Sequence, residues 1–456
     1  MRYVLPLIVL FSLTLHAKDK PGGIVVSATF CKDEPVFFSY QDHFSDNIVS
    51  LQVKSKGAWK VINSSYPILI FFSKDWKLFP VYAIPGDTIN AICNDHFGIE
   101  FYGNRGHSEL NILSVIEQKV GFFWPSLMSI RITKRLSFEY LSTSFDSLYK
   151  ERRKILDSVK NEIPESLKSI FHQFMKYRLA GDYLIPYVST NRDSEFDLIK
   201  DIPSSYLEKW NSVKVSIDES TMQDDRLYRT YLMSYNEYLA QDSIGNRNTK
   251  YMTLYNTAKH FFTGSIKEFL LFKYVKDSLI DKSSFVEDFR LTCKNKVFIN
   301  YIDSLIELRN NLTKDSKVLS GTLSKPNGSV LSFEDLLEIH KGKPIYIDFW
   351  ASWCGPCIAE IEPLREIEKV FQSRVSFVSI SIDEDRSKWL KALKKHSLPP
   401  TNQWLIANNS PLAKYLAIQS IPRFILIDKN GKAVSLNAPR PSNVNDLTHL
   451  LQLTLR

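Results

Sequence analysis

The sequence has few cysteines, few glycines and almost no long apolar runs. Five of its 456 residues are cysteine and 16 are glycine, and it contains no glycine-rich loop of the phosphate-binding kind. It also shows no H-E-x-x-H zinc motif, no nucleophile elbow and no recognisable pair of glycosidase carboxylates. No segment repeats at a fixed length, so a helical solenoid is not supported. These absences exclude the commonest hydrolase and nucleotide-binding motifs.

The longest apolar run lies near the N-terminus, at residues 4–15. It is shorter than the roughly 20 residues that a membrane-spanning helix needs. Arg2 precedes it, and Leu15-His16-Ala17 is a suitable cleavage site before the chain turns polar at Lys18. We therefore expect residues 1–17 to be a signal peptide and the protein to be exported to the periplasm or cell envelope. An uncleaved membrane anchor is the alternative.

Charge of neither sign dominates, since 58 basic and 50 acidic residues leave a net charge of +8. The densest basic clusters, at 151–154 and 394–396, are typical of solvated helix faces. A nucleic-acid partner is therefore not expected. Hydrophobic residues make up 44% of the chain, enough to fill real cores, and its length predicts two or three domains.

Three regions with different patterns follow the signal segment. Residues 18–106 contain strand-like runs between turn residues and predict a small all-β domain, an antiparallel sandwich or sheet. Residues 107–316 have helical spacing and predict an all-α domain. One helix there carries a stripe of tyrosines, which favours helix–helix core over a ligand groove. They are Tyr228, Tyr231, Tyr235 and Tyr238. Residues 317–456 alternate strands and helices and predict an α/β domain.

The last region has the clearest local signals. Asn327-Gly328 and Asn430-Gly431 each predict a hairpin turn, and Ser332 predicts the N-cap of a short helix. The runs at 343–350 and 375–382 are nearly continuously apolar, which is typical of strands buried on both faces. We expect the order strand, helix, strand, helix, strand, hairpin, helix.

Two cysteines, Cys354 and Cys357, form a C-x-x-C pair directly after the first of these strands. Half of a structural zinc site is one interpretation, but no other cysteine pair or histidines are arranged to complete four ligands. The remaining interpretation is a redox pair at the start of a helix. There the helix N-terminus would stabilise a thiolate on Cys354, the nucleophile, while Cys357 would resolve the mixed disulfide.

The segments DFWAS and WCGPC around this pair resemble thioredoxin. With VSFVSISIDED and IPRFILIDKNGK further on, they make roughly residues 321–456 similar to the TlpA/ResA-like disulfide oxidoreductases of the bacterial envelope. The resemblance implies a thioredoxin-like fold, a redox-active Cys354–Cys357 disulfide, and no cofactor or metal. It also suggests roles in cell redox homeostasis and cytochrome c-type biogenesis, where haem-binding thiols are kept reduced.

Two acids are further candidate catalytic residues by position. Asp348, six residues before Cys354, matches the buried acid of thioredoxin. A carboxylate in an apolar strand should have a raised pKa, and the implied role is proton exchange with Cys357. Glu360, three residues after Cys357, matches a glutamate that TlpA/ResA-like proteins often carry near the site. An ordinary exposed helix residue is the alternative interpretation of Glu360.

The resemblance also implies a substrate-docking surface. Pro422 matches the cis-proline that faces the cysteines in this fold, which places the backbone of Ile421 where an extended substrate segment can pair with it. Trp353 would form part of the same apolar surface. The family's helix proline would fall at Glu362, but Pro363 follows one residue later, so we expect the helix kink to be displaced.

Some positions leave alternatives open. Arg423, after the proline, is expected to face solvent; a guanidinium turned to the site would instead favour the thiolate. The odd number of cysteines leaves at least one thiol without a partner in the chain. Cys31 and Cys93 lie in the same predicted domain, but the sequence does not decide whether they pair with each other.

The sequence thus predicts an exported thiol–disulfide oxidoreductase. The Gly355-Pro356 insert resembles thioredoxin and favours a reductase of protein disulfides, recharged by a membrane thiol electron donor. A disulfide oxidant or isomerase is the first alternative. A non-catalytic envelope binding or scaffold protein, acting through its N-terminal domains, is the second. The joint presence of both cysteines, Asp348 and Pro422 argues against it. The oligomeric state is not set by the sequence.

Overall fold

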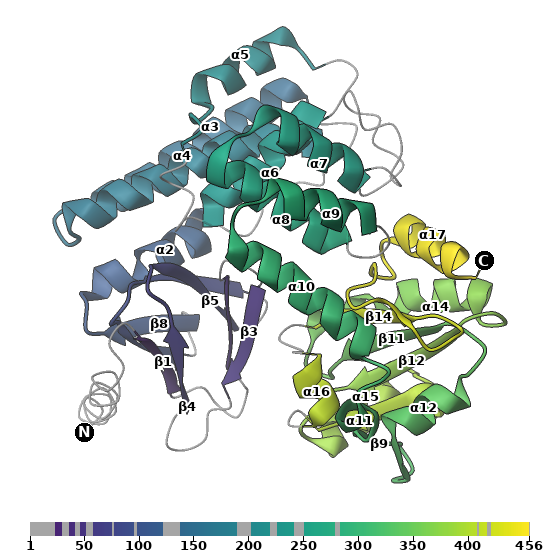
Figure 1. Cartoon of the computed structure of the whole chain (residues 1–456). Coiled ribbons are helices and arrows are strands. Elements are labelled where there is room, and N and C mark those ends of the chain that lie inside the picture. Colours follow the sequence, from purple (N-terminus) through teal and green to yellow (C-terminus); the bar gives the residue numbers. More distant parts are fainter. Residues whose placement is uncertain are drawn as a thin grey trace, which may run out of the picture. The chain divides into compact units, whose positions relative to one another are not determined.

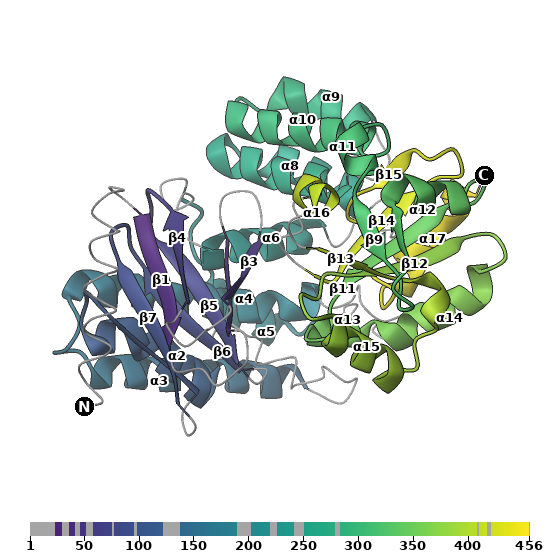
Figure 2. The same cartoon turned by 90° about the horizontal axis from the view of Figure 1, so that it is seen from below.

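The structure is a computed structural model of the chain. It covers residues 23–29, 36–41, 46–51, 58–74, 77–94, 98–121, 137–188, 202–218, 226–240, 250–278, 283–407, 410–416 and 421–455. Contacts between residues divide the chain into two compact units, Met1–Gln241 and Asp242–Arg456. Figures 1 and 2 show the elements of each unit from two directions. The signal peptide expected at 1–17 lies outside the described residues. Among the described helices, none is long and apolar enough to cross a membrane.

Within the described residues, the first unit opens with two four-stranded sheets, of order β4-β1-β7-β8 and β3-β2-β5-β6. The strands are β1 Gly23–Thr29, β2 Val36–Gln41, β3 Asp46–Leu51, β4 Ala58–Asn63, β5 Ile68–Lys74, β6 Lys77–Ala83, β7 Thr88–Asn94 and β8 Gly98–Gly103. Apolar side chains of both sheets, such as Val26 and Phe72, form one buried cluster. The first sheet is mixed rather than antiparallel as expected, because β1 and β7 pair in parallel. A parallel pair needs a crossover, which the intervening strands supply.

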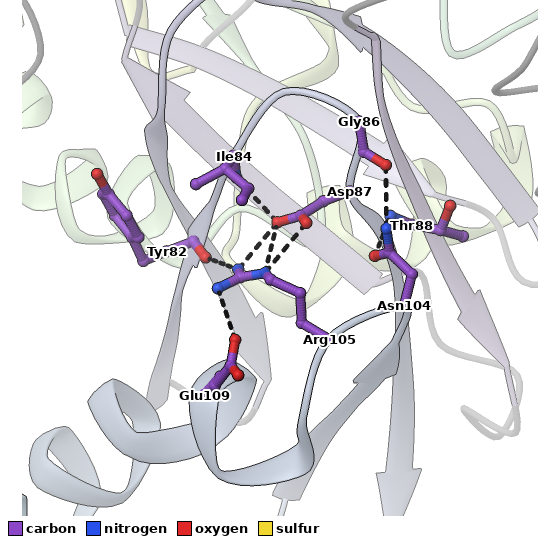
Figure 3. Close-up of polar contacts among 8 residues, drawn as sticks. All are labelled: Tyr82, Ile84, Gly86, Asp87, Thr88, Asn104, Arg105 and Glu109. Atoms are coloured by element: carbon purple, nitrogen blue, oxygen red, sulfur yellow. Dashed lines mark hydrogen bonds and ion pairs between the residues drawn. The ribbon is translucent and has the colours of Figure 1, made fainter. Parts of the chain in front are cut away.

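A half-buried arginine ties this β region to the first helix of the unit (Figure 3). Arg105 Nη2 and Nε donate to the carboxylate of Asp87 at 2.9 and 3.0 Å. The same Nη2 donates to the carbonyl oxygen of Tyr82, and Nη1 lies 3.6 Å from Glu109 Oε2 on helix α2. One side chain therefore joins strand β6, the turn before β7 and the start of α2.

The helices of the first unit fall in the region where the periodicity predicts them. They are α2 His107–Val120, α3 Phe138–Ser158, α4 Glu165–Val188, α5 Ser204–Val213 and α6 Arg226–Ala240. Helix α6 packs against α4. Tyr228 and Tyr231 of the tyrosine stripe are buried there, and Tyr235 and Tyr238 are half-buried. The stripe therefore contributes to helix–helix core, as predicted.

One basic residue expected on a solvated face is instead fully buried. Arg152 on α3 donates from Nε to the carbonyl oxygen of Gly121 at 2.8 Å, and its Nη1 lies 3.4 Å from Asp182 Oδ2 on α4. Arg178 on α4 also pairs with Asp182, at 2.8 Å. A buried guanidinium needs such partners, because burying an unpaired charge is very unfavourable. The partner acid lies 30 residues away, so the local pattern at 151–154 could not reveal it.

The second unit begins with helices and continues into the α/β domain. Its first helices are α7 Lys250–Phe261, α8 Gly264–Ser278, α9 Ser283–Thr292, α10 Lys296–Asn311 and α11 Ser316–Leu319. The later helices are α12 Phe333–Ile339, α13 Gly355–Ala359, α14 Ile361–Phe371, α15 Arg386–Lys395, α16 Pro411–Tyr415 and α17 Val444–Thr454, with a 3-10 turn, η5, at Pro400–Asn402. The strands are β9 Thr322–Ser324, β10 Val330–Ser332, β11 Ile345–Trp350, β12 Ser376–Ser381, β13 Gln403–Ile406, β14 Arg423–Ile427 and β15 Ala433–Ser435.

These strands form a seven-stranded sheet within the described residues, of order β10-β9-β13-β12-β11-β14-β15. The predicted order of elements is confirmed, with α16 added before β14. Both predicted hairpins are present, and Gly328 and Gly431 take the positive φ values, 92° and 79°, that their turns require. Ser332 caps α12 in a capping box with Asp335, which confirms the predicted N-cap.

The central strand β11 is buried on both faces, as its continuous apolar run predicts. Ile347 and Phe349 pack into the cluster that contains α12 and α16. Tyr346 packs into the opposite cluster, with α14 and α17, which lie side by side in Figure 1. Side chains alternate along a strand, so Asp348 shares the face of Tyr346. The position of this acid under α14 is thus set by strand periodicity.

Candidate functional site

The two cysteines lie where β11 passes into helix α13. Cys354 is the N-cap of α13, and its Sγ accepts a hydrogen bond from the backbone N–H of Cys357 at 3.2 Å. The two sulfurs are joined in a disulfide of 2.01 Å, with 5.2 Å between the Cα atoms. The N–H that reaches Sγ is the kind of donor that stabilises a thiolate once the disulfide is reduced. Both cysteines are buried, so attack on them requires a closely docked partner.

The short helix α13 has an identifiable cause. Proline at position 356 is accepted in the first turn, where no intrahelical bond is lost. Pro363 lacks the N–H that would bond to the carbonyl oxygen of Ala359, and α13 ends at that residue. The chain then bends at Glu360, which caps both α13 and α14. With the proline at position 363, the break between α13 and α14 falls at Glu360, one of the candidate acids.

Asp348 has the raised pKa expected for a carboxylate in an apolar strand. Burial, and to a smaller extent the negative charges of Glu360 and Glu368, raise its pKa to about 8. Its Oδ1 is buried and accepts no hydrogen bond from any residue that the structure describes. An acid that titrates near neutral pH can both take up and release a proton. Asp348 therefore has the protonation behaviour that proton exchange at neutral pH demands.

Glu360 is not an exposed helix residue, since only 6% of its surface is accessible. Ser442 donates two hydrogen bonds to its carboxylate, from the backbone N–H to Oε2 and from Oγ to Oε1, each 2.8 Å long. Arg440 Nη1 lies 3.9 Å from Oε1. These donors come from the loop before α17. No spacing rule links positions that lie 82 residues apart.

Two of the candidate docking residues, Ile421 and Pro422, come from a later part of the chain than the cysteines. The Ile421–Pro422 peptide bond is cis. Ile421 packs against the apolar cluster that contains both cysteines and Trp350. Trp353 is 39% exposed beside the pair. An exposed tryptophan and the cis-proline loop thus lie close to the disulfide.

Arg423 differs from the solvent-facing interpretation. It is half-buried, and its Nε donates to the carbonyl oxygen of Leu436 at 2.7 Å. Burial lowers the pKa of its guanidinium, and Tyr301 on α10 raises it. Because Arg423 is opposite Phe349 in the β11–β14 register, it belongs to the sheet face away from Asp348. The guanidinium is thus only partly exposed to solvent, and it does not share the sheet face of Asp348.

A third carboxylate, close to the cysteines in the chain's fold through Ser352, was not predicted from the sequence. Asp383, after β12, accepts hydrogen bonds from the backbone N–H and Oγ of Ser352, at 2.8 and 2.6 Å. Ser381 Oγ donates to the same carboxylate at 2.7 Å. This network fixes the residue two positions before Cys354. The segment SIDED carried the signal, because polar residues ending a buried strand often have structural partners.

Two further cysteines lie within the described residues, Cys293 and Cys93. Cys293 is a buried free thiol, and burial raises its pKa to about 11, so it is a poor nucleophile at neutral pH. Cys93 is disulfide-bonded. Cys31 lies outside the described residues, so its pairing with Cys93 stays open.

Comparisons with known proteins agree with the geometry. Residues 342–433 match a protein-family model described as thioredoxin-like. The thiol–disulfide oxidoreductase ResA of Geobacillus thermodenitrificans is 27% identical over 100 residues, which cover 22% of this chain and 56% of the relative. The thiol:disulfide interchange protein DsbE of Vibrio cholerae is 29% identical over 138 residues, covering 27% and 70%. A solved thiol–disulfide oxidoreductase from Bacteroides fragilis is 29% identical, with 28% of this chain and 95% of that chain covered and a TM-score of 0.25.

The family model matches the C-terminal part of the chain, and this chain spans little more than half the length of the ResA relative. The residues matched by the family model include the cysteine pair, Asp348 and Pro422. They fold into the predicted α/β sheet, with the cysteines at a strand–helix junction. The C-terminal part of this chain is therefore a thioredoxin-like domain, similar to the ResA and DsbE thiol–disulfide oxidoreductases.

Proposed function

We propose that the protein is an exported thiol–disulfide oxidoreductase that reduces protein disulfides in the cell envelope. The observation that carries the proposal is the Cys354–Cys357 disulfide at the start of α13, after a central strand that carries a buried acid, Asp348, with a pKa of about 8. The Gly355-Pro356 insert, which resembles thioredoxin, supports the reducing direction. Relatives named thiol–disulfide oxidoreductases support the reaction class.

In the reducing step, the thiolate of Cys354 attacks one sulfur of a substrate disulfide and the other substrate sulfur leaves as a thiolate. Cys357 then gives its proton to Asp348, and its sulfur attacks Cys354 Sγ. The second substrate sulfur leaves and the Cys354–Cys357 disulfide forms. Two electrons have passed to the substrate, whose two thiolates take up protons from solvent.

Recharging reduces the Cys354–Cys357 disulfide back to two thiols. A dithiol carrier in the membrane attacks Cys354 Sγ, and the Cys354–Cys357 bond breaks. Cys357 leaves with the electron pair and takes the proton held by Asp348. The second thiol of the carrier displaces Cys354, so the carrier becomes a disulfide and the protein a dithiol. Asp348 thus accepts a proton in one half-cycle and donates it in the other.

The reduction potential of Cys354–Cys357 tests this direction. The mature full-length protein would be equilibrated in defined thiol–disulfide buffers, and its free thiols counted by alkylation and mass spectrometry. We expect a potential near that of thioredoxin, about −270 mV. A value close to that of a strong oxidant, about −120 mV, would favour the oxidant or isomerase alternative. A pair that fails to exchange would overturn the redox function and favour a binding or scaffold role for the N-terminal regions.

Export is the second part of the proposal, and the N-terminal pattern of residues 1–17 supports it. Fractionation of expressing cells should recover the protein outside the cytoplasm, with a mature N-terminus at Lys18. A chain that retains Met1 and sediments with membranes would support the uncleaved anchor instead. A full-length chain in the cytoplasm would contradict export.

A further inference from the structure

Arg423 lies at the end of the sheet that leads into the cysteine pair. It is the first residue of β14 and stands opposite Phe349 in the antiparallel register of β14 with β11. Strand β11 ends at Trp350, four residues before Cys354. The start of β14 and the redox pair therefore share one end of the sheet. Arg423 also directly follows the cis peptide bond at Pro422.

The chain just before Arg423 contacts the cysteines. Ile421 packs against the apolar cluster that contains both of them. Two residues of chain span at most about 7 Å, so the Cα atom of Arg423 lies within about that distance of the Cα atom of Ile421. Because both cysteines are buried, a substrate must dock closely to bring its disulfide to Cys354. A docked substrate segment therefore passes near Arg423.

One hydrogen bond fixes the guanidinium of Arg423. Its Nε donates to the backbone carbonyl oxygen of Leu436 at 2.7 Å, which ties β14 to the segment after β15. Leu436 packs against the apolar cluster on the same face of the sheet as Phe349, so the acceptor is held in place. With Nε engaged, the two Nη atoms form the outer end of the guanidinium. Such a pair of donors matches the two oxygens of a carboxylate.

The positive charge of Arg423 has no acidic partner among the residues that the structure describes. Burial lowers the pKa of its guanidinium, and Tyr301 on α10 raises it, but a phenol is not an acidic partner at neutral pH. Asp348 belongs to the other face of the sheet. A half-buried cation without a counter-charge is unfavourable, so a carboxylate from a ligand would gain an interaction that the free protein lacks.

We propose that Arg423 is a specificity-determining residue, which binds an acidic side chain within about two residues of the reactive cysteine in the substrate protein. The proposal rests on the redox function proposed above and adds a substrate class, disulfides in acidic stretches of chain. The ion pair speeds docking and holds the substrate segment beside Cys354. Arg423 takes no part in the exchange of bonds between sulfurs.

The test compares substrates that differ only in charge. Full-length protein, reduced with dithiothreitol and then separated from it, is mixed with disulfide-linked dimers of a synthetic peptide that contains one cysteine. Three versions of the peptide carry Asp, Asn or Lys at both positions two residues from the cysteine. Oxidation of the protein is followed by quenching with an alkylating reagent and mass spectrometry. Each rate is divided by the rate at which 2-mercaptoethanol reduces the same peptide, which removes the effect of charge on the peptide disulfide itself.

For the wild-type protein, we expect the corrected rate to fall from the Asp to the Asn to the Lys peptide, by about tenfold in all. Arg423→Gln removes the charge and should react with the three peptides at nearly equal rates. Arg423→Lys should keep part of the preference, because it retains the charge but not the paired donors. Arg374→Gln is the matched control and should keep the whole preference. Arg374 is exposed and precedes β12, whose first residue, Ser376, pairs with the start of β11 at the opposite end of the sheet.

Each outcome separates this proposal from the redox function. If the wild-type protein reacts equally fast with all three peptides, Arg423 does not select substrates, while the redox function stands. If the preference for Asp survives in full in Arg423→Gln, another group reads the charge and the assignment is wrong. If the reduced wild-type protein reacts with none of the peptides, both proposals fail together. The ratio of rates is measured within one protein, so a partly folded variant slows all three peptides alike and still gives the ratio. If Arg423→Gln does not fold, a preference in Arg423→Lys equal to that of the wild-type protein would contradict the assignment.

Discussion

Asp348 links the protonation of the site to the stability of the fold. In the unfolded chain it titrates near 3.8, and in the folded protein near 8. Between these values the folded protein keeps a proton that the unfolded chain has lost. Each pH unit therefore lowers the free energy of unfolding by about 1.4 kcal/mol. The contribution is fully present below the unfolded value and is lost as the pH rises through the folded one.

The Asp348→Asn variant should remove this dependence. Relative to the wild-type protein, its free energy of unfolding should increase steadily from pH 5 to pH 8, by a few kcal/mol in total. Urea unfolding of the oxidised full-length chain at several pH values measures it. Glu334→Gln, at an exposed position of α12, is the control and should show no such trend. A stability difference that stays constant with pH would mean that Asp348 is ionised in the folded protein.

The proposed roles of the two cysteines predict different trapped species. Cys357→Ser should accumulate a mixed disulfide between Cys354 and a protein substrate, because the resolving thiol is missing. Cys354→Ser should form none, because the nucleophile is lost. Mass spectrometry without reducing agent detects the adduct. Cys293→Ser, which removes a buried free thiol, should behave like the wild-type protein. Trapping by both single variants would contradict the division into nucleophile and resolving thiol.

At the scale of elements, the ends of helices α13 and α14 position the candidate site residues. The cysteine pair starts α13 and Pro363 stops it at Ala359, so Glu360 falls at the junction with α14. Its buried carboxylate there meets the loop before α17. The sequence predicted a displaced break from the position of the proline. It did not indicate which distant loop would pair with the residue at the break.

The connection between the β region and α2 gives a stability prediction. Arg105→Ala would leave Asp87 buried without its positive partner and would also remove the bond to Tyr82, as Figure 3 shows. Breaking such a buried pair destabilises a protein by about 3–5 kcal/mol. Lys209→Ala is the control, because its pair with Asp146 is largely exposed and should contribute about 0–1 kcal/mol. Urea unfolding measures both. Equal losses in the two variants would show that Arg105 does not hold the two elements together.

At the scale of the whole molecule, the helices before the α/β domain belong with it by contact. Leu312, after α10, is fully buried in the same cluster as the central strand. Tyr415 on α16 donates a 3.1 Å hydrogen bond to the carbonyl oxygen of Leu308. The boundary between residues 316 and 317 stays a prediction from sequence, and it would separate these contacts.

Two fragments test how much these helices contribute. A fragment of residues 242–456 should unfold at a higher urea concentration than one of residues 317–456. Loss of a buried leucine and its neighbours costs on the order of 3 kcal/mol. The two fragments should be compared in the oxidised state at one pH. Equal midpoints would show that the α/β domain is independent of α7–α10.

The sequence by itself determined what depends on neighbouring positions: strand β11 with its buried acid, the N-cap of α12, the glycine turns and the cysteine pair at the start of a helix. Such features follow from spacings of two to four residues, where backbone geometry alone decides which groups meet. Only the tertiary structure decided that Ser442 holds Glu360, that Asp383 holds Ser352 and that Arg152 is buried against Asp182. These pairs lie 82, 31 and 30 residues apart. These residues meet only when whole elements pack against each other. The sequence around a polar residue does not show whether its hydrogen-bond partner is water or a distant side chain.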